Sequence, residues 1–185
     1  MRLFLALQLP EAAQDELDRV MSDLGAGRLM LPETYHITLS FLGDQTEDAA
    51  EAVHEEMEGL AFDPFPLALE SFGTFGDSPF ILWAGVGESA ALTALQRQVA
   101  GAVRRAGVET ERRRFRPHVT AARFRKRMGP DEAMALDLFL ARNTAFRGTP
   151  FVVDHVAFVQ STRLSDRAVH EVLARYPDGD ELDGG

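Results

Sequence analysis

Two short stretches of the sequence carry the same pair of polar side chains at the same spacing. His36 and Thr38 lie in the stretch 35–43, and His118 and Thr120 lie in the stretch 116–120, each within an alternating polar and apolar run. Successive side chains of a β-strand point to opposite faces. We therefore expect the histidine and threonine of each His-x-Thr motif to share one strand face, with Ser40 beside the first pair and the apolar residues facing the core.

Two imidazoles and two hydroxyls brought together are suited to acid–base chemistry at a phosphoryl group. A neutral imidazole accepts a proton from water, a protonated one gives a proton to a leaving alkoxide, and both forms are accessible near pH 7. Threonine hydroxyls donate hydrogen bonds to phosphoryl oxygens, and a nearby arginine adds a charge-assisted contact. The pattern indicates hydrolysis that uses no metal ion and no other cofactor.

A zinc site and a serine triad are weaker interpretations of the same residues. Histidine is a common zinc ligand, but neither motif has a carboxylate at its neighbouring positions on the same face. No Gly-x-Ser-x-Gly motif occurs, and Ser40 is only a neighbour on the strand. The remaining histidines, His54, His155 and His170, belong to no repeated pattern, and we interpret them as structural or solvent-exposed.

The elements that must position the motifs repeat in order. Apolar spacing predicts strands over 2–9, 35–42, 65–75, 80–86, 115–124, 151–159 and 169–174. It predicts helices over 11–24, 47–60 and 130–141, and one that Ser89 caps and Gly107 ends. Strand, helix, His-x-Thr strand, helix and strand thus occur over about 1–75 and again over about 79–160, which indicates an internal duplication within one α+β domain.

Length and composition favour one ordinary globular domain. The chain has 185 residues, of which 45% are hydrophobic and 26% charged, and it has no cysteine, which excludes disulfides, thiolate zinc sites and cysteine nucleophiles. We expect a single domain over 1–177 and a disordered acidic tail over 178–185. No apolar run is long enough to cross a membrane and the first residues resemble a strand more than a signal peptide, so we expect a cytoplasmic protein.

Charge is unevenly distributed. The formal net charge of −10 argues against a broad surface that coats nucleic acid. Basic residues nevertheless gather around the second motif: Arg112, Arg113, Arg114, Arg116, Arg123, Arg125, Lys126 and Arg127. The sequence predicts a local basic rim beside the site.

With these stretches in view, the sequence resembles the two-histidine (2H) phosphoesterases, and within them the RNA 2′,3′-cyclic phosphodiesterase branch, also called LigT-like or 2′-5′ RNA ligase proteins. The resemblance covers about residues 1–177 and rests on the stretches 2–7, 36–43, 82–85 and 115–123. It implies a bilobal, pseudo-twofold α+β fold in which two antiparallel sheets line a central cleft and helices lie outside. The sequence departs from the usual family pattern at Ala121, and at His170, where an aromatic residue is frequent.

The resemblance also implies a reaction and roles. A 2′,3′-cyclic phosphate at an RNA 3′ end is hydrolysed to a 2′-phosphomonoester without metal, and the reverse 2′-5′ joining can run in vitro. The implied roles are proton donor for His36, proton acceptor for His118, phosphate binding for Thr38, Thr120 and Arg123, and RNA or base binding for Phe41 and Arg116. The implied partner is a single-stranded RNA 3′ end or a nucleotide, with no membrane and with a monomeric protein.

Two of these roles conflict with simple strand geometry. Phe41 and Arg123 each lie five residues after a motif histidine, so strict alternation points both away from the cleft. Their roles require that each strand bulges or ends. A phosphodiesterase for a small cyclic nucleotide and a non-catalytic RNA- or nucleotide-binding module remain alternative functions at this stage.

Overall fold

The fold alternates strands and helices around one large antiparallel sheet. The structure is a computed structural model, and it describes residues 1–75, 80–110, 114–125, 127–164 and 168–177. The first half of the chain forms β1 (Arg2–Gln8), α1 (Glu11–Met21), β2 (Arg28–Leu29), the 3-10 helix η1 (Pro32–Thr34), β3 (His36–Asp44), α2 (Glu47–Glu58), β4 (Phe65–Leu67) and β5 (Leu69–Phe75). The second half forms β6 (Ile81–Val86), α3 (Ala90–Arg105), β7 (His118–Arg123), α4 (Pro130–Arg142), β8 (Phe151–Val153), β9 (Val156–Arg163) and β10 (Ala168–Tyr176).

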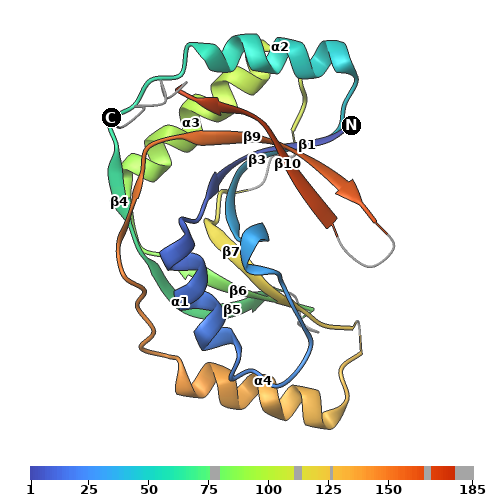
Figure 1. Cartoon of the computed structure of the whole chain (residues 1–185), viewed down its shortest axis with the longest axis vertical. Coiled ribbons are helices and arrows are strands. Elements are labelled where there is room, and N and C mark those ends of the chain that lie inside the picture. The colour runs from blue at the N-terminus through green and yellow to red at the C-terminus, as the bar shows by residue number, and fades with distance from the viewer. Residues whose placement is uncertain (76–79, 111–113, 126, 165–167, 178–185) are drawn as a thin grey trace, which may run out of the picture.

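The order of strands in the large sheet shows the duplication. The order is β10-β9-β1-β3-β7-β6-β5, with β2 paired to β7, while β4 and β8 form a second, two-stranded sheet. The halves β9-β1-β3 and β7-β6-β5 are mirror-ordered about the junction of the two motif strands, so β1 corresponds to β6 and β3 to β7. The α+β class with two antiparallel sheets and a pseudo-twofold repeat is confirmed. In Figure 1, α2 and α3 lie toward one end of the molecule and α1 and α4 toward the other.

Local sequence signals explain where the helices begin. The Thr46 hydroxyl accepts a hydrogen bond from the Ala49 N–H at 3.2 Å, and the Ser89 hydroxyl accepts one from the Leu92 N–H at 3.1 Å. Both are N-cap bonds that satisfy donors at the first turn of a helix. Gly107, with a φ of 77°, lies just beyond α3, where the left-handed backbone suits glycine. The predicted cap at Ser89 and the predicted stop at Gly107 are therefore confirmed.

β1 separates two apolar clusters. Leu3, Leu5 and Leu7 point into the main core, while Phe4 and Ala6 face the other way and join Ala157, Val159 and Val172. The strand is therefore apolar on both faces, which is typical of a central strand that is covered on each side. The second face is the one on which the motif side chains lie.

Two sequence-based expectations concern features outside the sheet. No helix of the described residues is long and apolar enough to span a membrane. The predicted tail, 178–185, lies outside the residues that the structure describes.

Candidate active site

The two motif strands lie next to each other in the large sheet. Ile37 of β3 pairs with Val119 of β7 in an antiparallel register, and both side chains are fully buried. Residues on either side of this pair point to the opposite face of the sheet, so the register sets His36 beside Thr120 and His118 beside Thr38. Directly opposite side chains in such a pair have Cβ atoms about 4.5–5.5 Å apart. The two imidazoles and two hydroxyls therefore form one cluster.

Each motif strand has a β-bulge three residues after its histidine. Across β1, Ala6 pairs with Thr38 and Leu5 pairs with Ser40, which leaves Leu39 as the extra residue. Across β6, Trp83 pairs with Thr120 and Leu82 pairs with Ala122, which leaves Ala121 extra. A bulge of this kind shifts the side-chain alternation by one residue. The pseudo-twofold repeat thus extends to an irregularity of the backbone.

The bulges resolve the two geometric conflicts and overturn one expectation. Phe41 pairs with Phe4 and Arg123 pairs with Ile81, so both lie on the motif face of the sheet. The prediction that Ser40 shares the face of His36 and Thr38 is wrong, because the bulge turns Ser40 toward the core. Ser40 pairs with Leu5 and is 8% exposed.

Backbone carbonyls fix the orientation of both imidazoles. Nδ1–H of His36 donates to the Thr34 carbonyl at 2.7 Å, and Nδ1–H of His118 donates to the Arg116 carbonyl at 2.7 Å. A carbonyl oxygen only accepts, so Nδ1 of each ring carries the proton. Nε2 of each ring is left for proton transfer, and the two copies of the motif hold it in the same way.

His36 lies in a crowded aromatic environment. Its ring stacks on Phe4 with 4.7 Å between ring centroids and meets His170 edge-on at 5.2 Å. Burial lowers the pKa of His36 to about 4, the bond to Thr34 acts in the opposite direction, and the charges of His170, His118 and Arg123 lower it further. At neutral pH the free protein therefore holds His36 in its neutral form.

His118 lies against the other half of the sheet. Its ring meets Phe75 edge-on at 4.9 Å and lies 6.4 Å from the Trp83 ring. Burial lowers its pKa from 6.5, the bond to the Arg116 carbonyl opposes this shift, and the Arg116 charge adds to it. A neutral imidazole with a free Nε2 is the form that accepts a proton.

His170 belongs to the site although sequence reasoning assigned it a structural role. The ring of this β10 residue meets both Phe4 and His36 edge-on, each at 5.2 Å. β10 pairs with β9, and β9 pairs with β1 over Leu3–Ala6, so the β9–β10 hairpin brings a residue distant in sequence next to Phe4 and His36 (Figure 1). The one signal in the sequence was the family's preference for an aromatic residue at this position, because an aromatic ring there packs against Phe4.

Replacing His170 by phenylalanine is expected to raise the pKa of His36. The substitution keeps a ring against Phe4 and His36 but removes a group whose positive charge disfavours the His36 cation. A titration of the His36 imidazole by NMR measures the shift, with His155→Phe as the control. An unchanged or lower pKa would show that His170 does not act on His36 electrostatically.

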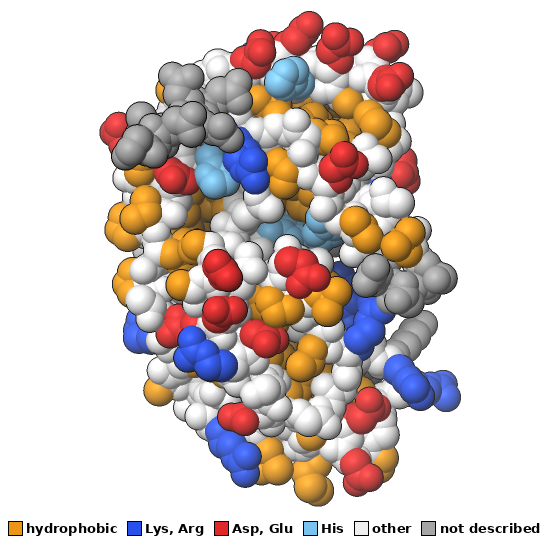
Figure 2. Space-filling model, viewed as in Figure 1, with side chains coloured by type: hydrophobic (Ala, Val, Ile, Leu, Met, Phe, Trp, Pro, Cys, Tyr) orange, Lys and Arg blue, Asp and Glu red, His pale blue; other side chains and the backbone are white. Residues whose placement is uncertain are grey.

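Arginines lie along one side of the cluster. Arg123 pairs with Arg28 of β2, which places both on the same face. Burial lowers the pKa of Arg123, and the charges of Arg28 and Arg163 lower it further. Figure 2 shows arginine side chains grouped beside the histidines on one face of the molecule. Of the predicted basic rim, Arg112, Arg113 and Lys126 lie outside the described residues.

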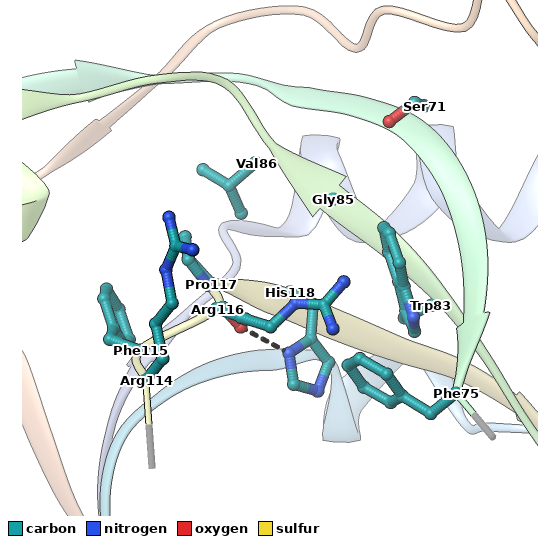
Figure 3. A pocket seen from close by; sticks show the side chains of 10 residues that line it. All are labelled: Ser71, Phe75, Trp83, Gly85, Val86, Arg114, Phe115, Arg116, Pro117 and His118. Atoms are coloured by element: carbon teal, nitrogen blue, oxygen red, sulfur yellow. Dashed lines mark hydrogen bonds between the residues drawn. The ribbon is translucent and has the colours of Figure 1, made fainter.

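The residues predicted to bind RNA lie on opposite halves of the sheet. Phe41 is 47% exposed, and the guanidinium of Arg2 lies 5.0 Å from its ring centroid. Arg116 extends over the Phe75 ring at 5.2 Å. Arg116 also lines a cavity of about 600 Å³ with His118 and Trp83, and Figure 3 shows these side chains around it.

The other histidines lie in different surroundings. Nδ1 of His54 bonds to the Tyr176 hydroxyl, and Nδ1 of His155 lies 2.6 Å from the Asp154 carboxylate. Both rings thus bond to residues outside the two motifs, in agreement with the structural interpretation. Within the described ranges, no group of three or more His, Cys, Asp or Glu side chains is arranged to hold a metal ion.

The sequence matches one family model and several relatives that share a name. A family model described as the 2′-5′ RNA ligase superfamily matches residues 9–164. The RNA 2′,3′-cyclic phosphodiesterase of Archaeoglobus fulgidus is 30% identical over 72% of this chain and 77% of its own length. The protein of that name from Geobacillus stearothermophilus is 35% identical over 94% of this chain. This chain spans 56% of the length of the Geobacillus protein.

Solved structures show the same fold. E. coli LigT in its apo form superposes with a TM-score of 0.76 at 21% identity, covering 95% of each chain. The protein TT0787 of Thermus thermophilus superposes with a TM-score of 0.76 at 24% identity, covering 95% of this chain and 96% of its own. At these identities the likeness establishes the arrangement of strands and helices.

Proposed function

We propose that this chain, which belongs to the 2′-5′ RNA ligase superfamily, is an enzyme that hydrolyses a 2′,3′-cyclic phosphate at an RNA 3′ end to a 2′-phosphomonoester. The observation that carries the proposal is the pairing of β3 with β7, which sets two histidines and two threonines on one face. The relatives named RNA 2′,3′-cyclic phosphodiesterase support the choice of substrate.

In the proposed reaction each imidazole moves one proton. Nε2 of His118 accepts a proton from water while the water oxygen bonds to phosphorus. The bond from phosphorus to O3′ breaks, and His36 gives its proton to O3′, so the phosphate stays on O2′. The side chains of His118 and His36 carry out both proton transfers, and the proposed mechanism therefore uses no metal ion and no cofactor.

The phosphate itself contacts the remaining motif residues. Thr38 and Thr120 donate hydrogen bonds to its non-bridging oxygens, and Arg123 adds a charge-assisted contact as negative charge develops. The bound anion also has an effect on His36: it favours the imidazolium, and so raises the pKa from about 4 toward the value that a general acid needs at neutral pH.

The RNA on either side of the phosphate contacts more exposed residues. We assign Phe41 to stacking on the terminal base and Arg116 to RNA contact. Because one chain supplies both motifs, a monomer is sufficient for activity. With a 5′ hydroxyl in place of water as the attacking group, the same site joins a 2′,3′-cyclic phosphate end to that hydroxyl through a 2′-5′ phosphodiester in vitro.

Replacing Arg123 by glutamine is expected to weaken RNA binding and make it less dependent on salt. Removing one phosphate contact to single-stranded nucleic acid reduces the slope of log K against log[salt] by about 0.7. Binding of a non-hydrolysable RNA end, measured at several salt concentrations, gives this slope. Arg97→Gln on the exposed side of α3 is the matched control, and equal slopes for the two variants would remove Arg123 from the phosphate site.

The alternatives are separated by comparing substrates. The protein, with chelator present, is given an oligoribonucleotide ending in a 2′,3′-cyclic phosphate and, separately, a 2′,3′-cyclic mononucleotide. A higher kcat/KM for the oligonucleotide is expected, because only it extends along the arginines. A preference for the mononucleotide would favour the small-substrate phosphodiesterase, and binding without turnover would favour a non-catalytic module.

A further inference from the structure

The cavity beside His118 has the composition of a nucleobase site. Its volume is about 600 Å³, and one wall is aromatic, formed by Phe75 and Trp83 with 5.5 Å between ring centroids. Arg116 lies over the Phe75 ring, so a cation and two π surfaces meet at one place. Aromatic rings and arginine planes are the surfaces on which unpaired bases stack.

Glycines let the Trp83 ring and the β5 backbone pack closely at this wall. A Cβ at Gly73 would lie 2.3 Å from the Trp83 ring, and one at Gly85 would lie 2.8 Å from the Glu70 carbonyl oxygen. Gly85 pairs directly with His118 and adds no side chain beside the imidazole. His118 itself lines the cavity.

The far end of the cavity is polar. Ser71 has a φ of 55°, which is rare for a residue other than glycine, and lies at a bulge between Glu70 and Phe72 of β5. The bulge brings Ser71 to the cavity, whose lining it joins, and Figure 3 shows it on the same side as Trp83, at the end away from His118. A hydroxyl both donates and accepts hydrogen bonds, as recognition of a base edge requires.

The position of the cavity relative to the two histidines suggests which nucleoside it holds. His118 lines the cavity, whereas His36 lies against Phe4 and His170 on the other half of the sheet. Phe41, assigned above to the terminal base of the RNA, belongs to β3 on that other half. In a displacement at phosphorus, the attacking and leaving oxygens lie roughly in line on opposite sides. The cavity is therefore on the side from which the attacking oxygen approaches.

We propose that this cavity is a second nucleoside subsite, which holds the nucleoside whose 5′ hydroxyl replaces water as the attacking group. The inference rests on the proposed function. Nε2 of His118 takes the proton of the 5′ hydroxyl, and the 5′ oxygen bonds to phosphorus. The bond from phosphorus to O3′ breaks and O3′ receives a proton from His36. The product is a 2′-5′ phosphodiester beside a free 3′ hydroxyl.

Trp83 gives a direct measurement of occupancy, because it is the only tryptophan of the sequence. Adenosine is titrated into the protein with tryptophan excited at the red edge of its absorption, where the nucleoside absorbs little. The expected result is a saturable change in fluorescence. A change that stays linear, as for a free tryptophan derivative, would overturn the subsite.

The competition between water and adenosine tests the chemistry. With an RNA 2′,3′-cyclic phosphate present, the ratio of 2′-5′-joined product to 2′-phosphate is expected to rise with adenosine and to saturate. Phe75→Leu and Arg116→Gln are each expected to lower this ratio by about 5- to 100-fold, because each removes a surface on which the base stacks. The same enzyme forms both products in one reaction, so a general loss of activity lowers both and leaves their ratio unchanged. Arg97→Gln, which lies on α3, is expected to match the wild type.

The two measurements separate this inference from the function on which it rests. Saturable fluorescence without hydrolysis of the cyclic phosphate would contradict the proposed function and keep the nucleoside site. Hydrolysis with a ratio that neither adenosine nor the two cavity variants change would contradict the subsite and keep the function.

Discussion

Replacing His118 by alanine is expected to lower kcat by about 10²- to 10⁴-fold, because the attacking water loses its proton acceptor. His118 is suited to this role by its geometry: Nδ1–H is bonded to the Arg116 carbonyl, so Nε2 is the proton-accepting nitrogen of the neutral ring. Its pKa lies below 6.5, so the wild-type rate is expected to fall as the pH decreases through that pKa and the imidazole becomes protonated.

The control for this substitution is His155→Ala, which makes the same chemical change at a histidine that contacts Asp154. Single-turnover rates with a cyclic-phosphate RNA end, measured for the wild type and both variants across pH, report the chemical step. A His118→Ala enzyme that retains nearly the wild-type rate would exclude His118 as the base.

Replacing His36 by alanine is expected to cause a loss of similar size, about 10²- to 10⁴-fold, through the leaving group rather than the nucleophile. A sulfur atom in place of O3′ leaves as a thiolate, which needs no proton. The 3′-thio substrate is therefore expected to restore much of the activity of His36→Ala, and to restore none of the activity of His118→Ala.

This pair of variants assigns the two roles, which the internal symmetry leaves open. If the 3′-thio substrate restored activity to His118→Ala instead of His36→Ala, His118 would be the acid and His36 the base. With a pKa of about 4, His36 is neutral in the free protein at neutral pH. Its role as the acid therefore requires that the bound phosphate anion raises this pKa and with it the protonated fraction. Titration of His36 with bound 2′-AMP is expected to show a higher pKa than in the free protein.

Much of the fold was predictable because it depends on local periodicity. Leu92, Leu95 and Val99 recur at helical spacing and are all buried on one face of α3. Ser89 caps α3 where the sequence indicated. The duplicated order of elements also predicted that the motif strands correspond, and the central pairing of β3 with β7 follows from that symmetry.

The bulges were not predictable in the same way. Leu39 lies between the polar residues Thr38 and Ser40, so the sequence continues to alternate across the bulge, and Ala121 is followed by a second alanine. The bulge arises from pairing with β1 and β6, which alternation within a single strand does not report. For this reason alternation alone misplaced Ser40 and pointed Phe41 and Arg123 away from the cleft, whereas both lie on the motif face.

His170 shows a second limit of sequence reasoning. It belongs to no motif, and it reaches His36 only because β10 pairs with β9 and β9 pairs with β1. Its effect on the pKa of His36 depends on that tertiary contact and on burial. The chemistry of the site was therefore indicated by the two motifs, whereas its electrostatics required the fold.

Identification of the hydrolysis product tests the central claim most directly. An oligoribonucleotide ending in a 2′,3′-cyclic phosphate is incubated with the protein and a chelator, and the product is identified by ³¹P NMR against authentic 2′- and 3′-phosphates. If His36 protonates O3′ while His118 activates water, the product is a 2′-phosphomonoester with a free 3′ hydroxyl. A 3′-phosphate, or no turnover, would contradict the account.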